Sequence, residues 1–319
     1  MGRAVALALL VGGLAACRAP TPAAPEAPRS ASSSRYPPAE GLPGCRLYDT
    51  PRAVGRVPLV LAELSGLAAS HRHPGVLWAH NDSGNALQVF ALDETGAVLA
   101  TLTLTGPDVS GMDVEDISLG PCAPGDARTC VYLADTGDNF ERREQVRLLR
   151  FPEPETVADA TLAVEVLPFE WPDRPHDCES LVIEPGTGRP VLITKEGDSL
   201  GGVFALEGLA PGTVARAPAR GPLRVPGSAV DRRTTAAALH PSGQRLLLRT
   251  YTRVWEVRRA GASRMEELLE GEVVEVPGAS QAQAEALTWL PADGHSSDSR
   301  SYLLGSEFAG QRLYRVDCR

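Results

Sequence analysis

The amino-acid sequence predicts an all-β fold made of many short strands. The 319 residues include 31 Gly and 27 Pro, and turn-forming residues at this density interrupt the chain too often for long helices. Pairs of short apolar runs, each pair joined by a turn that contains Gly or Pro, recur along the chain. Such a pair is typical of two antiparallel strands in a β-hairpin. The repetition indicates an array of equivalent units.

Five units share this plan, and they begin at Glu63, Glu115, Glu179, Thr235 and Glu285. A third predicted strand follows each pair, at residues 87–92, 146–151, 202–206, 254–257 and 312–316. A fourth strand follows in the first four units and is clearest at residues 98–104, where apolar and polar side chains alternate. The fifth unit lacks this strand because the chain ends at Arg319, and residues 57–61 are the predicted replacement.

Four-stranded sheets repeated around an axis, with an N-terminal strand completing the last sheet, predict a β-propeller. The number of units favours five blades. Two alternatives are a sixth blade, if residues 209–225 form an irregular unit, and a two-sheet β-sandwich. Trp78, Trp255 and Trp289 lie in predicted strands, where we expect them to fill the gaps between blades.

The N-terminal segment predicts export and lipid attachment. Residues 1–16 contain Arg3 and an apolar run too short to span a bilayer, as in a signal peptide. The run Leu14-Ala15-Ala16-Cys17 resembles a bacterial lipobox, which implies a lipid on Cys17; an ordinary signal peptide is the alternative. Residues 17–44 are rich in Pro, Ala and Ser and predict a flexible tether. Arg18 after the lipidated residue favours the outer membrane in a bacterium with two membranes.

The cysteines outside the signal segment predict two disulfide bonds, which exported proteins commonly form. Cys122 and Cys130 flank a loop-like insert, so we predict that they pair. Cys45 and Cys318 would join the two ends of the predicted propeller domain, residues 45–319. Cys178 is left over and is predicted to be a reduced, half-buried thiol. A nucleophilic Cys178 is the alternative, with His176 as the nearby base.

Acidic residues recur at two positions of the units. The start of the first strand lies beside the end of the second strand in a hairpin, and the innermost strands of a propeller surround its central channel. We therefore expect carboxylates to gather at one channel mouth: Glu63 with Asp82, Glu115 with Asp135, Glu179 with Glu196, and Glu285 with Glu307. The fourth unit has Thr235 and Tyr251 at these positions, and the candidate positive charges are Lys195, Arg233 and Arg249.

Three interpretations of these carboxylates are open. In the first, they accept hydrogen bonds from backbone N–H groups of neighbouring blades and hold the ring together. In the second, they bind Ca²⁺, which prefers about six to eight oxygen ligands, with Glu115, Asp135, Glu179 and Glu285 as the ligand set and Asp138 and Asn139 as further donors. In the third, a pair such as Glu115 and Glu285 performs general acid–base catalysis, as in glycoside hydrolysis.

Charge and motif spacing exclude several functions. The net charge of −9 becomes −10 when Arg3 is removed with the signal peptide, so the protein has no electrostatic attraction to a phosphate backbone and we expect no nucleic-acid partner. No phosphate-binding glycine loop is present. His80, His176 and Cys178 lack the spacing of a zinc site.

Several short segments resemble those of a known group of propellers. They are Glu63-Leu64-Ser65-Gly66-Leu67, Val114-Glu115-Asp116-Ile117, residues 134–139 and Glu285-Ala286-Leu287. They are similar to segments of bacterial secreted propeller proteins related to phytase-like esterase and SdiA-regulated domains, and the resemblance covers residues 57–316. It implies the propeller fold, and its motifs are specific for the blade rather than for a reaction.

Together these features predict a lipid-anchored protein of the bacterial cell envelope. We expect it to bind a small molecule, a protein partner or a divalent cation at the acidic channel mouth. The alternative is a Ca²⁺-dependent hydrolase, of the phytase-like esterase or the glycosidase type, that uses the same carboxylates.

Overall fold

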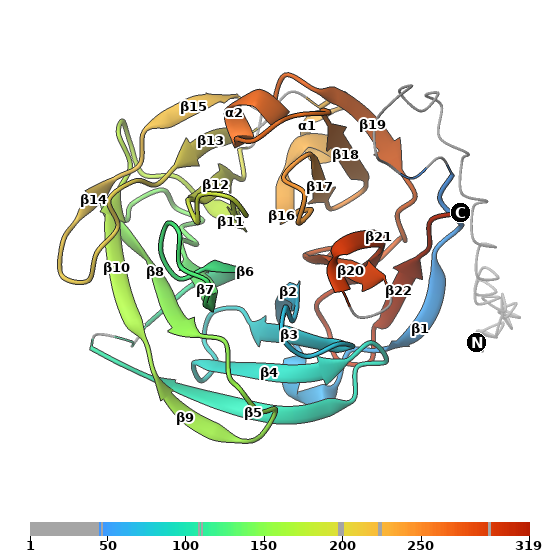
Figure 1. The fold of residues 1–319 in the computed structure, drawn as a ribbon, viewed down its shortest axis with the longest axis horizontal. Coiled ribbons are helices and arrows are strands. Elements are labelled where there is room, and N and C mark those ends of the chain that lie inside the picture. Colours follow the sequence, from blue (N-terminus) through green and yellow to red (C-terminus); the bar gives the residue numbers. More distant parts are fainter. Residues whose placement is uncertain are drawn as a thin grey trace, which may run out of the picture. The chain divides into compact units, whose positions relative to one another are not determined.

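Five β-sheets surround a central axis in the computed structural model of the chain, and each sheet is one blade of a β-propeller (Figure 1). The structure describes residues 45, 47–107, 109, 111–196, 201–222, 225–292 and 295–319. The five-bladed propeller is therefore confirmed, and the β-sandwich alternative is wrong. The predicted signal peptide, the lipid site Cys17 and the tether at residues 17–44 lie outside the described residues.

Each blade contains four antiparallel strands, ordered from the channel outward. The first blade is β2 (Leu64–Ala69), β3 (Val76–Asn81), β4 (Gln88–Asp93) and β5 (Val98–Thr105). The second is β6 (Val114–Pro121), β7 (Thr129–Asp135), β8 (Gln145–Pro152) and β10 (Glu165–Glu170). The third is β11 (Cys178–Ile183), β12 (Pro190–Thr194), β13 (Gly202–Ala205) and β15 (Ala219–Pro222). The fourth is β16 (Thr234–Leu239), β17 (Arg245–Thr250), β18 (Val254–Arg258) and β19 (Glu272–Val276).

The fifth blade closes the ring with a strand from the start of the domain. It contains β20 (Ala286–Ala292), β21 (His295–Gly305), β22 (Arg312–Val316) and β1 (Arg52–Arg56), and β1 pairs antiparallel with β22. Closure by an N-terminal strand is confirmed, but the strand predicted at residues 57–61 is wrong. Proline has no N–H to donate to a sheet, and after Pro58 the chain forms the 3₁₀ helix η1 (Leu59–Leu61), which buries Leu61.

Residues 209–225 do not form a sixth blade. They supply β15 and the short strand β14 (Ala215–Arg216), which lies parallel to β10 at the outer edge of the second blade. The strand β9 (Ala160–Ala163) extends the first blade in the same way, parallel to β5. The helices α1 (Ala229–Arg232) and α2 (Met265–Leu268) are single turns between strands. No helix among the described residues is long and apolar enough to cross a membrane.

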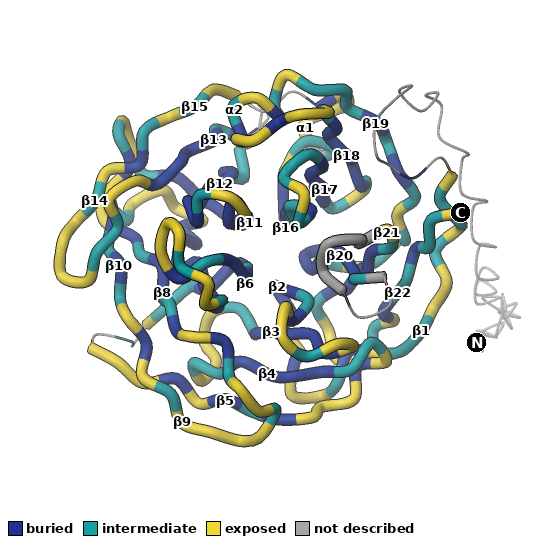
Figure 2. The backbone as a smooth tube through the Cα atoms, in the orientation of Figure 1, coloured by how far each residue is buried: buried dark blue, intermediate teal, exposed yellow. Residues whose placement is uncertain are grey.

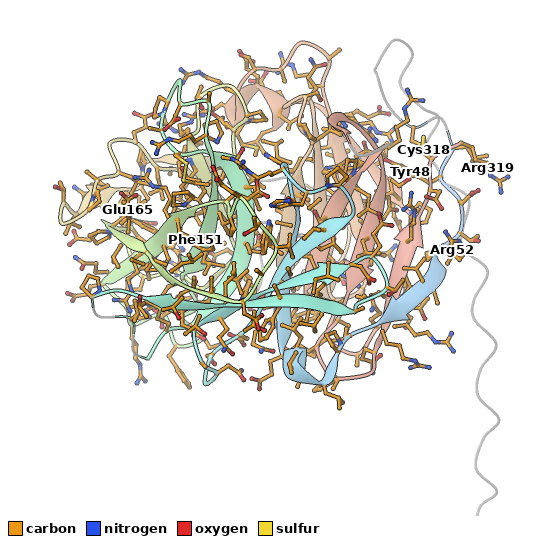
Figure 3. All side chains as sticks on the ribbon, turned by 60° about the horizontal axis from the view of Figure 1, so that its bottom comes forward. Tyr48, Arg52, Phe151, Glu165, Cys318 and Arg319 are labelled. Carbon is orange, nitrogen blue, oxygen red and sulfur yellow. A yellow bond between two sulfur atoms is a disulfide. The ribbon has the colours of Figure 1, made fainter. Side chains whose placement is uncertain are left out.

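Both predicted disulfide bonds are present. Cys122 and Cys130 bridge the β6–β7 hairpin, and Cys45 and Cys318 join the two ends of the domain. Tyr48 pairs with Cys318 beside this second bond, close to the closing strand that carries Arg52 (Figure 3). Cys178 is a free thiol as predicted but is fully buried, and burial raises its pKa. A nucleophilic role for Cys178 has no support, because the thiolate is the reactive form.

Five apolar clusters lie in the five gaps between neighbouring blades. Trp78 packs between the first and second blades, Trp255 between the third and fourth, and Trp289 between the fourth and fifth. The prediction for the tryptophans is therefore confirmed. The inner and middle strands are mostly buried, whereas the outer strands are more exposed (Figure 2).

Candidate functional site

The register of the inner hairpins decides which side chains reach the channel mouth. Four inner hairpins have an equivalent residue pair at the mouth end, and the pairing becomes irregular on the inner strand directly after it. These pairs are Leu64 with Asn81, Val114 with Asp135, Cys178 with Thr194, and Thr234 with Thr250. A β-bulge of this kind redirects a side chain and is common beside binding sites. The residues at these irregularities include Ser65, Glu115, Glu179 and Thr235.

Carboxyl groups from four blades converge at this mouth. Oxygen atoms of Glu115, Asp177 and Glu179 all lie within 4.8 Å of one another, and the same holds for Asp82, Asp113 and Glu115. Glu285 and Glu307 of the fifth blade form a side-chain hydrogen bond, and Glu307 interacts with Asp82 and Glu63. We call Asp82, Asp113, Glu115, Asp177, Glu179, Glu285 and Glu307 the acidic mouth; Glu63 lies exposed at its rim.

Burial and mutual repulsion hold protons on several of these groups. Burial raises the pKa of Glu115 well above its usual value, and Glu179, Asp82, Asp113 and Asp177 raise it further. The pKa of Asp82 rises to about 6 and that of Glu307 to about 8, in both cases mainly through burial. Carboxyl groups this close cannot all ionise without a compensating cation. Protons therefore compensate part of the negative charge of the acidic mouth.

Lys195 supplies a positive charge to the acidic mouth, and Tyr251 supplies a neutral hydroxyl donor beside it. The Nζ of Lys195 contacts Oε1 of Glu179 and lies 3.9 Å from Oδ2 of Asp177. The Tyr251 hydroxyl donates to Oε1 of Glu285 over 3.2 Å. Burial raises the pKa of Glu179 even though Lys195 opposes this shift, and the carboxylates raise the pKa of Lys195 against its own burial. Lys195 is therefore positively charged.

Arg249 and Arg233 do not line the acidic mouth as counter-charges. The buried Arg249 donates from Nη1 to the carbonyl oxygens of Ala286 (2.7 Å) and Gly305 (2.8 Å), so it joins the fourth blade to the fifth. Burial lowers its pKa to about 9, and the nearby Glu285 acts against this shift. Arg233 is exposed.

Two predicted mouth residues point elsewhere. Asp135 is fully buried and accepts from Arg143 (2.9 Å) and Arg147 (2.5 Å), so its charge is already compensated. Glu196 accepts from Arg174 (2.9 Å) and contacts His176 (2.8 Å), outside the acidic mouth. Neighbouring residues of a strand face opposite sides, so an alignment that is wrong by one residue selects the wrong side chain.

The sequence interpretation did not include Asp113 and Asp177. Each precedes a predicted acid by two residues, in Asp113-Val114-Glu115 and Asp177-Cys178-Glu179, and this spacing was the available signal. Asp138 is not a free oxygen ligand for a cation, because its Oδ2 accepts the backbone N–H groups of Arg142 (2.5 Å) and Arg143 (2.6 Å). Asn139 lies exposed beside it.

Gly137 provides the space that the carboxyl groups occupy. A Cβ atom at this position would overlap Oε1 of Glu115 and lie 2.6 Å from Cγ of Asp113. Gly84 supplies a positive φ to the equivalent turn of the first blade (φ +77°), whereas Gly137 is not in the left-handed region. Glycine is needed at 137 because the acidic mouth is crowded.

The groups that join the blades are different from the acidic mouth. The buried Asp116 accepts the N–H groups of Ile117 (2.8 Å) and, in the next blade, Leu181 (2.7 Å). Hydroxyl groups of Ser65, Thr136 and Thr235 donate to carbonyl oxygens of the following blade. The first interpretation, in which an acid accepts backbone N–H groups of the neighbouring blade, therefore applies to Asp116. Asp116 was not among the predicted site residues.

The histidines have ordinary structural surroundings. His80 is buried, its Nδ1 lies 2.9 Å from the carbonyl oxygen of Asn81, and burial lowers its pKa to about 4. His176 lies between Glu196 and Asp173.

From the sequence we predicted that no Gly-x-Ser-x-Gly elbow is present, and this prediction is wrong as to the pattern itself. Gly197-Asp198-Ser199-Leu200-Gly201 has the Gly-x-Ser-x-Gly form of an esterase elbow, which requires a strand–turn–helix context. It lies between β12 and β13, so a strand follows it, and Ser199 itself is outside the described residues.

Comparison with known proteins adds no family assignment: no protein-family model matches the chain, and no curated protein matches it. Conclusions about function therefore depend on the geometry of the acidic mouth.

Proposed function

We propose that the acidic mouth binds a divalent cation, and that Ca²⁺ is the ion that fits it best. The observation that carries this proposal is the buried triad of Glu115, Asp177 and Glu179, whose oxygen atoms lie within 4.8 Å of one another. Burying like charges this close is costly unless protons or a cation compensate them. A bound cation would remove that repulsion.

The donor chemistry supports a hard cation. Every member of the two triads offers carboxylate oxygen, and Ca²⁺ is bound by oxygen ligands in flexible geometry. Oε2 of Glu179 is buried and has no hydrogen-bond partner among the described residues. A buried polar atom without a partner is uncommon, and here it lies on a residue of the triad. Asp135, which the sequence placed in the ligand set, is replaced in this proposal by Asp177.

Calorimetry tests the proposal directly. CaCl₂ is titrated into protein treated with EDTA, and thermal melting is measured with and without the ion. Glu115→Gln should bind at least about tenfold more weakly, because one charged ligand is lost. Glu270→Gln is the matched control, since Glu270 is 74% exposed and pairs only with the surface residue Arg259. No heat and no melting shift in the unchanged protein would reject a Ca²⁺ site.

Hydrolysis is the second candidate function. Glu285 and Glu307 form a hydrogen bond between carboxyl groups, and the pKa of Glu307 is raised to about 8. A carboxyl that keeps its proton at neutral pH beside a second carboxyl is an arrangement that general acid–base catalysis uses. A screen of phosphate esters, carboxylic esters and glycosides, with and without Ca²⁺, tests it. Turnover abolished by Glu285→Gln in a folded protein would support the hydrolase, and no turnover of any substrate would reject it.

We also propose that the protein is lipid-anchored in the bacterial cell envelope. The support is the segment Leu14-Ala15-Ala16-Cys17 together with the two disulfide bonds, which are typical of oxidising compartments. Metabolic labelling with a fatty acid should label the unchanged chain and not Cys17→Ala. An unlabelled wild-type chain would reject the anchor.

A further inference from the structure

Lys195 places a positive charge against the buried triad. Its Nζ contacts Oε1 of Glu179, and its side chain is only 13% exposed. Its backbone N–H donates to the carbonyl oxygen of Asp177 over 2.8 Å, which fixes the start of the side chain beside the triad. An ammonium group therefore already compensates part of the charge that a metal ion would compensate.

A second partner for this ammonium group lies nearby. Nζ of Lys195 lies 5.5 Å from the centre of the Tyr251 ring, within the range of a cation–π interaction. Lysine has a flexible four-carbon stem, so its charged end can leave Glu179 without movement of the backbone. The Tyr251 ring then remains as a partner for the ammonium group.

We propose that Lys195 is the resident counter-ion of the triad and determines which cations it accepts, so that only a cation of higher charge displaces it. This inference rests on the proposed cation site. A monovalent ion gains no more attraction from the carboxylates than the ammonium it replaces, whereas a divalent ion gains twice as much at the same distance. The result is selection for divalent ions over Na⁺ and K⁺.

The unpaired oxygen of Glu179 supports the same conclusion. Lys195 occupies Oε1, while Oε2 is buried and has no hydrogen-bond partner among the described residues. The carboxylate therefore keeps one oxygen available when the ammonium is in place. An arriving ion can contact Oε2 before Lys195 leaves Oε1.

The test replaces Lys195 by Met, which keeps the apolar stem and removes the charge. Arg174→Met is the matched control, because it removes the same charge from the segment that precedes β11. Arg174 pairs with Glu141 and Glu196, outside the triad. Calorimetry with CaCl₂ is run at about pH 9, where fewer protons occupy the carboxyl groups. Melting shifts caused by NaCl and KCl are measured at constant ionic strength against tetramethylammonium chloride.

We expect Lys195→Met to bind Ca²⁺ about tenfold more tightly, because the competing charge is gone. It should also gain a melting shift in Na⁺ or K⁺ that the unchanged protein and Arg174→Met lack. Calcium binding that is equal in Lys195→Met and Arg174→Met would overturn the role of Lys195 and leave the cation site intact. Calcium binding by Lys195→Met alone would show that Ca²⁺ does not displace Lys195, and would overturn both the selection for divalent ions and the Ca²⁺ site in the unchanged protein. No binding by any of the three proteins would reject both.

Discussion

Gly137 lies against the carboxyl group of Glu115 so closely that no side chain fits between them. A Cβ atom at 137 would overlap Oε1 of Glu115, although Glu115 lies in β6 and Gly137 follows the end of β7. The backbone of Gly137 is not in the left-handed region, so alanine can adopt the backbone conformation at this position. The constraint comes from the acidic mouth alone.

Gly137→Ala should therefore weaken Ca²⁺ binding while the propeller stays folded. The new methyl group pushes the Glu115 and Asp113 carboxyl groups away from their positions, and we expect affinity to fall at least about tenfold because ligand geometry is lost. Gly186→Ala is the control, since no atom lies within 4 Å of a Cβ at that position. Calorimetry measures affinity, and circular dichroism checks the fold. Equal affinity in the two variants would contradict the position assigned to the cation.

The raised pKa values of Glu307 and Asp82 predict how stability depends on pH. A carboxyl group with a pKa of about 8 in the folded protein and about 4.3 in the unfolded chain binds more protons when folded. Its stabilising contribution is complete below the unfolded value and disappears as the pH rises through the folded value. Metal-free protein should therefore melt at lower temperature as the pH increases from about 6.5 to 9.

Saturating Ca²⁺ should remove this decline, because the cation takes over the charge that protons compensate at low pH. Glu307→Gln should reduce the slope in EDTA, since an amide does not titrate. Melting curves recorded at several pH values, in EDTA and in CaCl₂, measure both effects. A melting temperature that stays constant or rises over this pH range in EDTA would contradict the conclusion that carboxyl groups of the acidic mouth hold protons.

The repeat carried most of the information about the fold. Recurring pairs of apolar runs identified the five blades, and the incomplete fifth unit indicated closure by an N-terminal strand. The closing strand predicted at residues 57–61 was wrong because this segment is as apolar as a strand, whereas Pro58 cannot donate to a sheet and a 3₁₀ helix follows it. The ladder continues instead through Arg52–Arg56, which has a less apolar sequence.

The candidate site was harder to predict because strand register decides it. Asp82 donates its N–H to the carbonyl oxygen of Glu63, and Lys195 does the same to Asp177. Glu63 is therefore equivalent to Asp177, and the residue equivalent to Glu179 in the first blade is Ser65. The sequence alignment matched Glu63 to Glu179 by residue type, an error of two positions. Bulges in the inner strands add residues at these points, and sequence periodicity does not reveal them.

The bond between Cys45 and Cys318 should contribute more to stability than the bond between Cys122 and Cys130. The first spans 273 residues and the second spans 8, and a disulfide restricts the unfolded chain more when its loop is longer. Replacing Cys45 and Cys318 by Ser should lower the free energy of unfolding by about 2 to 4 kcal/mol. Urea unfolding of both double variants, each with its other disulfide intact, gives the comparison. An equal or larger loss for the Cys122 and Cys130 pair would contradict this ranking of the two bonds.

Two neighbouring acids, Glu115 and Asp116, should respond to substitution in opposite ways. Asp116→Ala removes the acceptor for the N–H groups of Ile117 and Leu181, and leaving buried donors unpaired should cost about 2 to 4 kcal/mol of unfolding free energy. Glu115→Gln removes one of several crowded charges and should leave the metal-free protein at least as stable as the unchanged chain.

Calcium affinity should show the reverse order. Glu115→Gln should lose binding, whereas folded Asp116→Ala should retain it, because Asp116 belongs to neither triad. Urea unfolding in EDTA and calorimetry on the same preparations measure both properties. If Glu115→Gln is the variant that unfolds and Asp116→Ala the one that loses the ion, then the acidic mouth holds the blades together, and the cation must be bound elsewhere.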